Sequence, residues 1–179
     1  MDDIPFYTLS GVRLNLNDIQ PEQIELYEVA NALSNQGRYN GQTESFYSVA
    51  EHCVLLMRFA REAQFSVEVQ KALLMHDASE AYCGDIVYYL KQNLPFFKQV
   101  EDKVLQAVYS RFAIDTSPRT MEIVHKYDRA ICVDEMFQLM NGVDTNLNKH
   151  EKLGIKVERW DPATARAVFL VECEKLGIE

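Results

Sequence analysis

Apolar and polar residues alternate along the first segment of the chain, on both sides of the step from Ser10 to Gly11. Alternation of this kind places successive side chains on opposite faces of an extended strand. Serine and glycine between two such runs favour a turn. Residues 6–16 are therefore predicted to form a small β-hairpin.

Beyond this hairpin the apolar residues recur every three or four positions, which is typical of one face of an α-helix. A first helix is predicted to begin at 18–21. It should end before the loop 35–43, because two glycines and two asparagines there cannot sustain a helix. Later helices are predicted at 46–61, 67–82, 97–112 and 119–140, with a last one from Asp161-Pro162 to Gly177.

The helix at 67–82 is the least polar of these, so it is predicted to be central and buried. The segment 143–157 is polar and is predicted to be a loop. The whole pattern predicts an all-α helical bundle with a small N-terminal β-hairpin, and residues 1–179 are expected to form a single domain.

Composition narrows the class of protein. The chain has 179 residues, and 47% of them are apolar, which is enough for a full core. The net charge is −9, so duplex nucleic acid is not an expected partner, since phosphate contacts need clustered Lys and Arg. No apolar run reaches the roughly 20 residues that span a bilayer, so no membrane partner is expected.

Two further features bear on the compartment. The first residues, Met-Asp-Asp, do not resemble a signal peptide. The four cysteines are far apart and lack metal-site spacing, so we expect small buried side chains rather than disulfides or ligands. Together these features lead us to expect a cytoplasmic protein.

The pair His76-Asp77 is the most informative chemical feature, because it lies in the least polar predicted helix. A buried ionised carboxylate has to be paired, protonated or bound to a metal. His52 and Asp128, on two other predicted helices, complete a set of two imidazoles and two carboxylates. That set suits Zn, Co, Mn, Ni or Fe(II) better than Ca, so these four residues are predicted to bind one divalent ion.

A His-Asp pair is common in proteins, and the alternative is that Asp77 only caps or pairs with His76 in the core and no metal is bound. Glu80 and Asp85 favour the metal, because crowded carboxylates repel one another unless a cation lies among them. Glu80 follows Asp77 by three residues on the same helix face and is a candidate general base. His125 is expected at the surface or behind the ligands, and His150 is expected to be exposed.

The order of these residues resembles the H…HD…D signature of HD-domain phosphohydrolases. The likeness extends over Arg38-Tyr39-Asn40-Gly41, over the run from Phe46 to His52, and over the run from Leu74 to Ile86. These segments are similar to the YfbR-like 5′-deoxynucleotidases, to the YfdR group and to phage-encoded dATP triphosphohydrolases of the DatZ type. The chain differs from many relatives at Val87-Tyr88, where a proline-bearing turn is common, and at Gln42, where a histidine is often found.

The resemblance implies a role for each matching position. The four predicted ligands His52, His76, Asp77 and Asp128 correspond to the metal ligands of the family. Glu80 corresponds to the acid that orients or activates the attacking water. Asp85 corresponds to a residue near the sugar that is linked to a preference for 2′-deoxyribose.

The resemblance also implies contacts with the nucleotide. Arg38 corresponds to an arginine that contacts phosphate, and Lys91 resembles a second basic residue with that role. Tyr39 stands where relatives carry an aromatic side chain beside the nucleotide. The implied cofactor is a divalent metal ion, with Co, Zn or Mn favoured, and the implied assembly is a homo-oligomer, a dimer or larger.

The expected activity is metal-dependent hydrolysis of 2′-deoxynucleotide phosphates, with a purine substrate of the dATP or dAMP type favoured by the resemblance. The alternatives are a strict 5′-nucleotidase for deoxynucleoside monophosphates of any base, a non-catalytic regulatory module that binds metal or nucleotide, and a helical interaction protein without metal. Glu80 and Asp85 favour an enzyme, because a purely structural site needs no acid to activate water.

Overall fold

The chain begins with the predicted hairpin in the computed structural model, which describes residues 6–144, 146 and 151–179. Strand β1 (Phe6–Tyr7) pairs antiparallel with β2 (Arg13–Leu14), so that Phe6 lies opposite Leu14. The amide of Gly11 donates to the carbonyl of Thr8 at 3.0 Å and closes the turn. Gly11 has a φ of 81°, which glycine adopts without strain.

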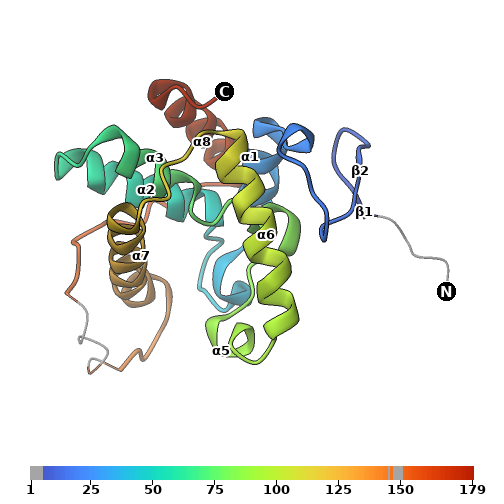
Figure 1. Cartoon of the computed structure of the whole chain (residues 1–179). Coiled ribbons are helices and arrows are strands. Elements are labelled where there is room, and N and C mark those ends of the chain that lie inside the picture. Colours follow the sequence, from blue (N-terminus) through green and yellow to red (C-terminus); the bar gives the residue numbers. More distant parts are fainter. Residues whose placement is uncertain (1–5, 145, 147–150) are drawn as a thin grey trace.

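Helices account for most of the remaining described chain, and the all-α prediction is confirmed (Figure 1). The α-helices are α1 (Leu26–Asn35), α2 (Val49–Glu62), α3 (Val67–Met75), α4 (Glu80–Cys83), α5 (Tyr88–Lys91), α6 (Pro95–Arg111), α7 (Pro118–Leu139) and α8 (Pro162–Leu176). Two 3₁₀ turns, η1 (Pro21–Gln23) and η2 (Arg38–Gly41), flank α1.

Side-chain caps explain where several helices begin. Helix α2 starts three residues later than predicted because the Ser48 hydroxyl accepts a hydrogen bond from the amide of Glu51 at 3.1 Å. The carboxylate of Asp161 accepts from the amide of Thr164 at 2.9 Å and caps α8, as its sequence indicated. Gly177 ends α8 in the left-handed conformation, with a φ of 66°.

Helix α3 is the centre of the core, as predicted. Its residues from Ala72 to Met75 are fully buried, and the helix packs on α2, α7 and α8. Full burial of each large apolar side chain stabilises the fold by roughly 1.5–3 kcal/mol. The buried apolar side chains form one cluster that includes residues from β2 to the C-terminal side of α8. This packing leaves little freedom to the residues that directly follow α3.

The single helix predicted at 67–82 is wrong, because α3 ends at Met75 and a tight turn leads into α4. Within this turn the amide of Ala78 donates to the carbonyl of Met75, and that of Glu80 donates to Asp77 at 2.9 Å. Such bonds between residues three apart give about three residues per turn, which brings residues i and i+3 into line. The turn therefore aligns Asp77 with Glu80 at the end of the buried helix.

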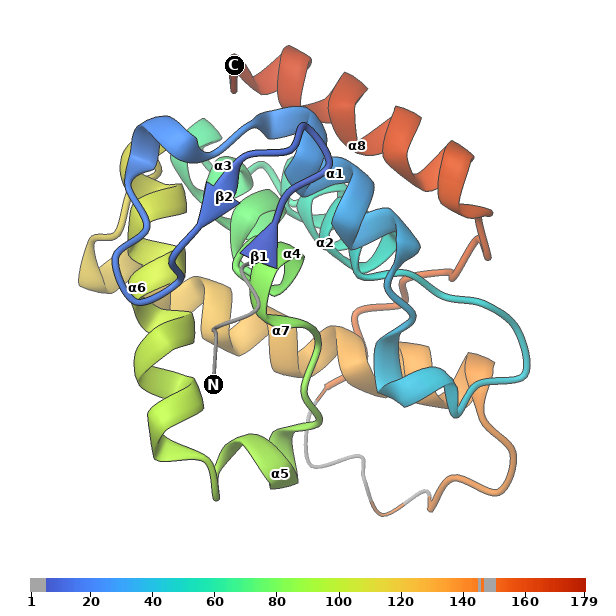
Figure 2. The ribbon, with the colours of Figure 1, turned by 90° about the vertical axis from the view of Figure 1, so that its right-hand side faces the viewer.

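The remaining elements surround this centre. Figure 2 shows α8 along one side of the bundle, α6 with α5 on the opposite side, and α7 running across between them. Helix α8 packs on α1 and α2, and α6 packs on α4 and α5. Helix α5 had not been predicted. The four cysteines are free, two of them buried and two partly buried, and none of the described helices could cross a membrane.

Candidate metal centre

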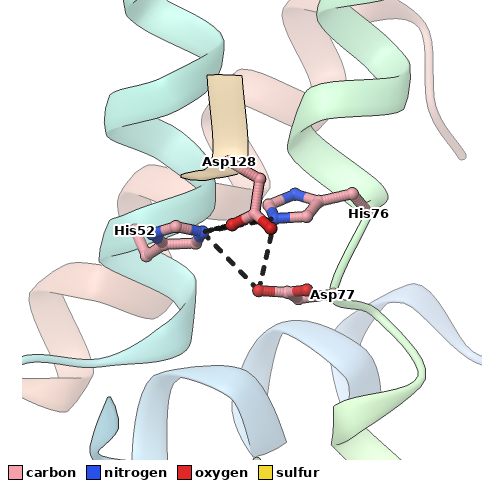
Figure 3. Close-up of side chains that lie close together, drawn as sticks. All are labelled: His52, His76, Asp77 and Asp128. Carbon is pink, nitrogen blue, oxygen red and sulfur yellow. Dashed lines mark hydrogen bonds and ion pairs between the residues drawn. The ribbon is translucent and has the colours of Figure 1, made fainter. Parts of the chain in front are cut away.

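Four side chains from three helical regions meet at one point beside α3. His52 comes from α2, His76 and Asp77 from the turn after α3, and Asp128 from α7 (Figure 3). Each offers one ligand atom, and these atoms all lie within 4.8 Å of one another. The structure thus brings together all four residues that the sequence singled out as metal ligands.

The separations between these atoms suit a divalent cation. His52 Nε2 lies 3.2 Å from His76 Nε2 and 3.3 Å from Asp128 Oδ1. His76 Nε2 lies 3.3 Å from Asp77 Oδ2 and 3.5 Å from Asp128 Oδ1, and His52 Nε2 lies 3.6 Å from Asp77 Oδ2. Metal–ligand bonds of about 2.1 Å place tetrahedral ligands roughly 3.4 Å apart. These five separations, 3.2 to 3.6 Å, therefore match those expected around one such ion.

The hydrogen bonds behind the two rings select the tautomer that a metal requires. His76 Nδ1 lies 2.8 Å from the carbonyl of Leu73, and His52 Nδ1 lies 2.5 Å from the carboxylate of Glu135. A carbonyl and a carboxylate can only accept, so both Nδ1 atoms carry hydrogen. The neutral rings then present Nε2 lone pairs to each other, an arrangement that a cation between them satisfies.

The charges of the site favour a cation in the same place. Burial alone would lower the pKa of His76, but Asp77 beside it raises that pKa well above 6.5. Burial alone would raise the pKa of Asp77, but His76 lowers it to about 2. Protons on the histidines and a divalent ion therefore compete for one anionic pocket.

The site is closed behind the histidines and open beside the carboxylates. The side chains of His52 and His76 are 0% and 5% exposed, whereas those of Asp77 and Asp128 are 19% and 35% exposed. A structural metal site is closed on all sides, and a catalytic site keeps one position accessible. Among the four clustered side chains, the two carboxylates are the groups exposed to an approaching small molecule.

Glu80 is a buried carboxylate close to Asp77, at the start of α4. Its Oε2 atom is buried and has no hydrogen-bond partner among the described residues. Its Oε1 atom lies 3.7 Å from Lys91 Nζ. Burial, followed by the negative charges of Asp77 and Asp85, raises the pKa of Glu80 well above 4.5. A carboxyl group with a raised pKa and a free oxygen is equipped to take a proton from a water molecule.

Asp85 is held close to Glu80 by a turn of the backbone and by the side chain of Gln36. Gly84 ends α4 with a φ of 82°, a conformation that favours glycine, and the chain turns there. The amide of Asp85 donates to Gln36 Oε1 at 3.0 Å, while Gln36 Nε2 donates to the carbonyl of Glu80 at 2.8 Å. Burial raises the pKa of Asp85, and the charges of Arg38 and Asp77 also act on it.

Arg38 and Tyr39 lie beside the centre, but neither extends freely toward solvent. Arg38 is buried, and its Nη1 atom donates to Asp77 Oδ2 at 3.2 Å, the same oxygen that faces the two histidines. The hydroxyl of Tyr39 donates to Glu135 Oε2 at 2.5 Å. Their contacts with a nucleotide stay predictions.

Lys91 reaches the site from α5. Its ammonium group lies 2.7 Å from Glu101 Oε1 in addition to its contact with Glu80. His125 is exposed on α7, as expected, and lies outside the ligand cluster. His150 lies outside the residues that the structure describes.

Sequence reasoning missed Glu135, which contacts the ring of His52, and Gln36, which contacts the backbone of Glu80 and Asp85. Glu135 lies on α7 seven residues after Asp128, so the two share one helix face after two turns. That spacing could have indicated Glu135. Gln36 lies in a polar loop, and nothing local distinguishes it from its neighbours.

Comparison with known proteins agrees with this geometry. The model of the family described as HD domain matches residues 31–164. The chain is similar to the uncharacterized protein YfdR of Escherichia coli (strain K12), with 36% identity over 120 residues that cover 67% of this chain and 63% of the relative. An uncharacterized protein of Rhodobacter capsulatus is 35% identical over 111 residues, which cover 59% and 57% of the two chains. The chain thus spans about three fifths of the length of these relatives.

Proposed function

The chain belongs to the HD domain family, and on this premise we propose that it is a metal-dependent phosphohydrolase of the YfbR-like and DatZ-like group. The proposed substrates are 2′-deoxynucleotide phosphates, with a purine nucleotide of the dATP or dAMP type preferred. The products are phosphate, in one or more units, and a deoxynucleoside or its monophosphate.

One observation carries the proposal. Two of the clustered ligands, Asp77 and Asp128, are partly exposed, and Glu80, close to Asp77, has a buried oxygen without a hydrogen-bond partner among the described residues. A structural metal site would need neither feature, since its ligands enclose the ion completely. A non-catalytic module would also gain nothing from a buried carboxylate whose ionisation costs free energy.

His52, His76, Asp77 and Asp128 would hold the cation. When bound, a divalent ion supplies Lewis-acid polarisation of a phosphoryl oxygen and lowers the pKa of a coordinated water molecule. The chain's own carboxylate, Glu80, then takes a proton from the attacking water as its oxygen bonds to phosphorus. The leaving oxygen departs with the electron pair of the broken P–O bond.

Two cationic side chains offset the charge on the phosphoryl oxygens. The guanidinium of Arg38 is already oriented at the centre by Asp77, which reduces the entropy lost when a phosphate binds. Lys91 lies within 3.7 Å of Glu80 and is steadied by Glu101. Asp85, next to Glu80 in the fold, is proposed to meet the deoxyribose.

Phosphate release from a panel of nucleotides tests the proposal. Metal-free protein would be supplied with Co²⁺, Mn²⁺, Zn²⁺ or Mg²⁺ and assayed with mono- and triphosphates of deoxyribonucleosides and ribonucleosides. We expect turnover of deoxynucleotides that depends on the cation. Chromatography of the products separates a monophosphatase from an enzyme that cleaves triphosphates.

A matched pair of histidine substitutions controls for folding. His52→Gln removes a ligand, whereas His125→Gln removes an exposed imidazole from α7 outside the cluster. We expect the first variant to lose activity and bound metal, and the second to keep both. If metal-loaded protein hydrolyses no nucleotide, the proposal is wrong and a non-catalytic metal-binding module is the better description.

A further inference from the structure

The carboxylate of Glu135 joins the metal centre to the segment that carries Arg38. We propose that Glu135 is the positioning residue of the site: it fixes the His52 ring with Nε2 toward the other ligands and holds Arg38 and Tyr39 beside them. The inference concerns how the site is assembled, and it rests on the metal centre of the proposed function.

Each oxygen of Glu135 has its own set of partners. Oε1 accepts from His52 Nδ1 at 2.5 Å and from the hydroxyl of Tyr47 at 2.7 Å. Oε2 accepts from the hydroxyl of Tyr39 at 2.5 Å and lies 3.4 Å from Arg38 Nε. Glu135 is fully buried, and Arg38 and His52 hold its pKa at about 2 although burial alone would raise it. One charged, acceptor-only group thus serves four partners.

The partners come from separate parts of the chain. Helix α7 carries Glu135 together with the predicted ligand Asp128, and α2 carries His52. Arg38 and Tyr39 belong to η2, whose base is closed by a bridge between Gly37 and Ser48. Glu135 therefore ties two ligand-bearing helices to the loop that supplies the arginine.

The loop needs such a restraint because its backbone is strained. Tyr39 and Asn40 have φ values of 56° and 52°, and two consecutive non-glycine residues seldom adopt this left-handed conformation. The hydrogen bond from the Tyr39 hydroxyl to Glu135 holds the first of them in place. A carboxylate that served stability alone could pair with Arg38 and leave the ring of His52 untouched.

The isosteric variant Glu135→Gln separates positioning from packing. The amide keeps the shape of the side chain but replaces one acceptor oxygen with an NH₂ donor. If that group faces His52, the ring must accept at Nδ1 and carry its hydrogen on Nε2, where it blocks a metal ligand. If it faces η2 instead, the Tyr39 hydroxyl loses its acceptor. In either orientation the negative charge that pairs with Arg38 and with the His52 ring is gone.

The affinity for Co²⁺, measured by competition with a chelator, is the first readout. We expect Glu135→Gln to weaken binding by about 10–100-fold, the usual effect of removing a group that orients a ligand. Glu172→Gln is the matched control, because Glu172 is a buried carboxylate paired with Arg58 and Arg61 on α2. We expect this control to bind Co²⁺ like the unaltered protein. Equal affinity in Glu135→Gln and the unaltered protein would overturn the inference.

The second readout needs neither metal nor activity. Nitrogen-15 NMR of the metal-free protein identifies which ring nitrogen of His52 carries hydrogen. We expect hydrogen on Nδ1, shifted strongly downfield by the carboxylate, and loss of this signal in Glu135→Gln. If the variant does not fold, a missing Nδ1–H signal in the unaltered protein would overturn the inference. Protein that binds Co²⁺ but cleaves no nucleotide would refute only the proposed function.

Discussion

Glu80→Gln should abolish activity and stabilise the metal-free protein at the same time. The substitution removes the group proposed to accept a proton from water, so we expect kcat to fall by about 10²–10⁴-fold. Glu80 is not a predicted ligand, so the variant should keep its bound metal. These two outcomes together would separate the proton acceptor from the cation site.

The gain in stability follows from the surroundings of Glu80. Its Oε2 atom is buried without a partner among the described residues, close to the negative charges of Asp77 and Asp85. Each pKa unit by which burial and these charges raise the pKa of Glu80 corresponds to about 1.4 kcal/mol of lost stability above the folded pKa. A neutral amide avoids the repulsion, and for a chain of this length we expect the Tm of metal-free protein to rise by about 2–10 °C.

The pH dependence of this gain has a definite sign. Burial and the neighbouring carboxylates raise the folded-state pKa of Glu80 above its unfolded value of 4.5. The folded protein therefore binds the proton more tightly, and stability falls as pH rises from 4.5 through the folded pKa. Glu80→Gln escapes this loss, so its advantage should be absent near pH 4.5 and largest above the folded pKa.

Thermal unfolding in a chelating buffer at several pH values, beside steady-state kinetics of the metal-loaded protein, checks both effects. The cation partly offsets the repulsion, so the stability difference should shrink when metal is added. A variant that is less stable than the unaltered protein at pH 8 without metal would refute the electrostatic reasoning. Loss of bound metal would show that Glu80 also holds the cation, which contradicts its assignment as a proton acceptor outside the ligand set.

Three other changes test separate parts of the structure. Asp128→Asn removes a predicted ligand. A cation at about 100 times its Kd should stabilise the unaltered protein by about 2.7 kcal/mol in thermal unfolding, whereas the variant should show no such gain. The apparent affinity for the cation should rise with pH until the raised pKa of His76 is passed, because the metal must displace the proton of His76. Calorimetry that finds no change in affinity between about pH 6 and 8 would contradict this. Glu51 accepts hydrogen bonds from three backbone amides, those of residues 158–160, each at 2.8 Å. Glu51→Ala should therefore lower the free energy of unfolding, measured in urea, by about 3 kcal/mol or more. A loss under about 1 kcal/mol would show that water replaces these bonds.

Local signals in the sequence were sufficient to predict the N-terminal hairpin and the last helix. The alternating pattern at 6–16 became the hairpin, and the cap at Asp161 with the stop at Gly177 bounded α8 within one residue. These features depend on interactions between residues close in sequence, such as a side chain that caps the amide three residues later. The apolar run before His76 likewise marked a helix whose last four residues are fully buried.

The break after Met75 could not be predicted in this way. Residues 76–83 have ordinary helical propensities, and their composition gives no reason for a tight turn until Gly84. Packing of α3 against three other helices decides where its regular hydrogen bonding ends. The short helix α5 was missed for a different reason, since four residues carry too little periodicity to detect.

The identities of the candidate site residues could be read from the chain, but their arrangement could not. His52, the His76-Asp77 pair and Asp128 are separated by 24 to 76 positions, and only tertiary packing brings their ligand atoms within 4.8 Å. The exposure of the two carboxylates, the burial of Glu80 and the contacts of Glu135 likewise depend on which helix faces meet. Sequence spacing determines which side chains share a helix face, whereas distances and exposure between helices arise only when their apolar faces pack together.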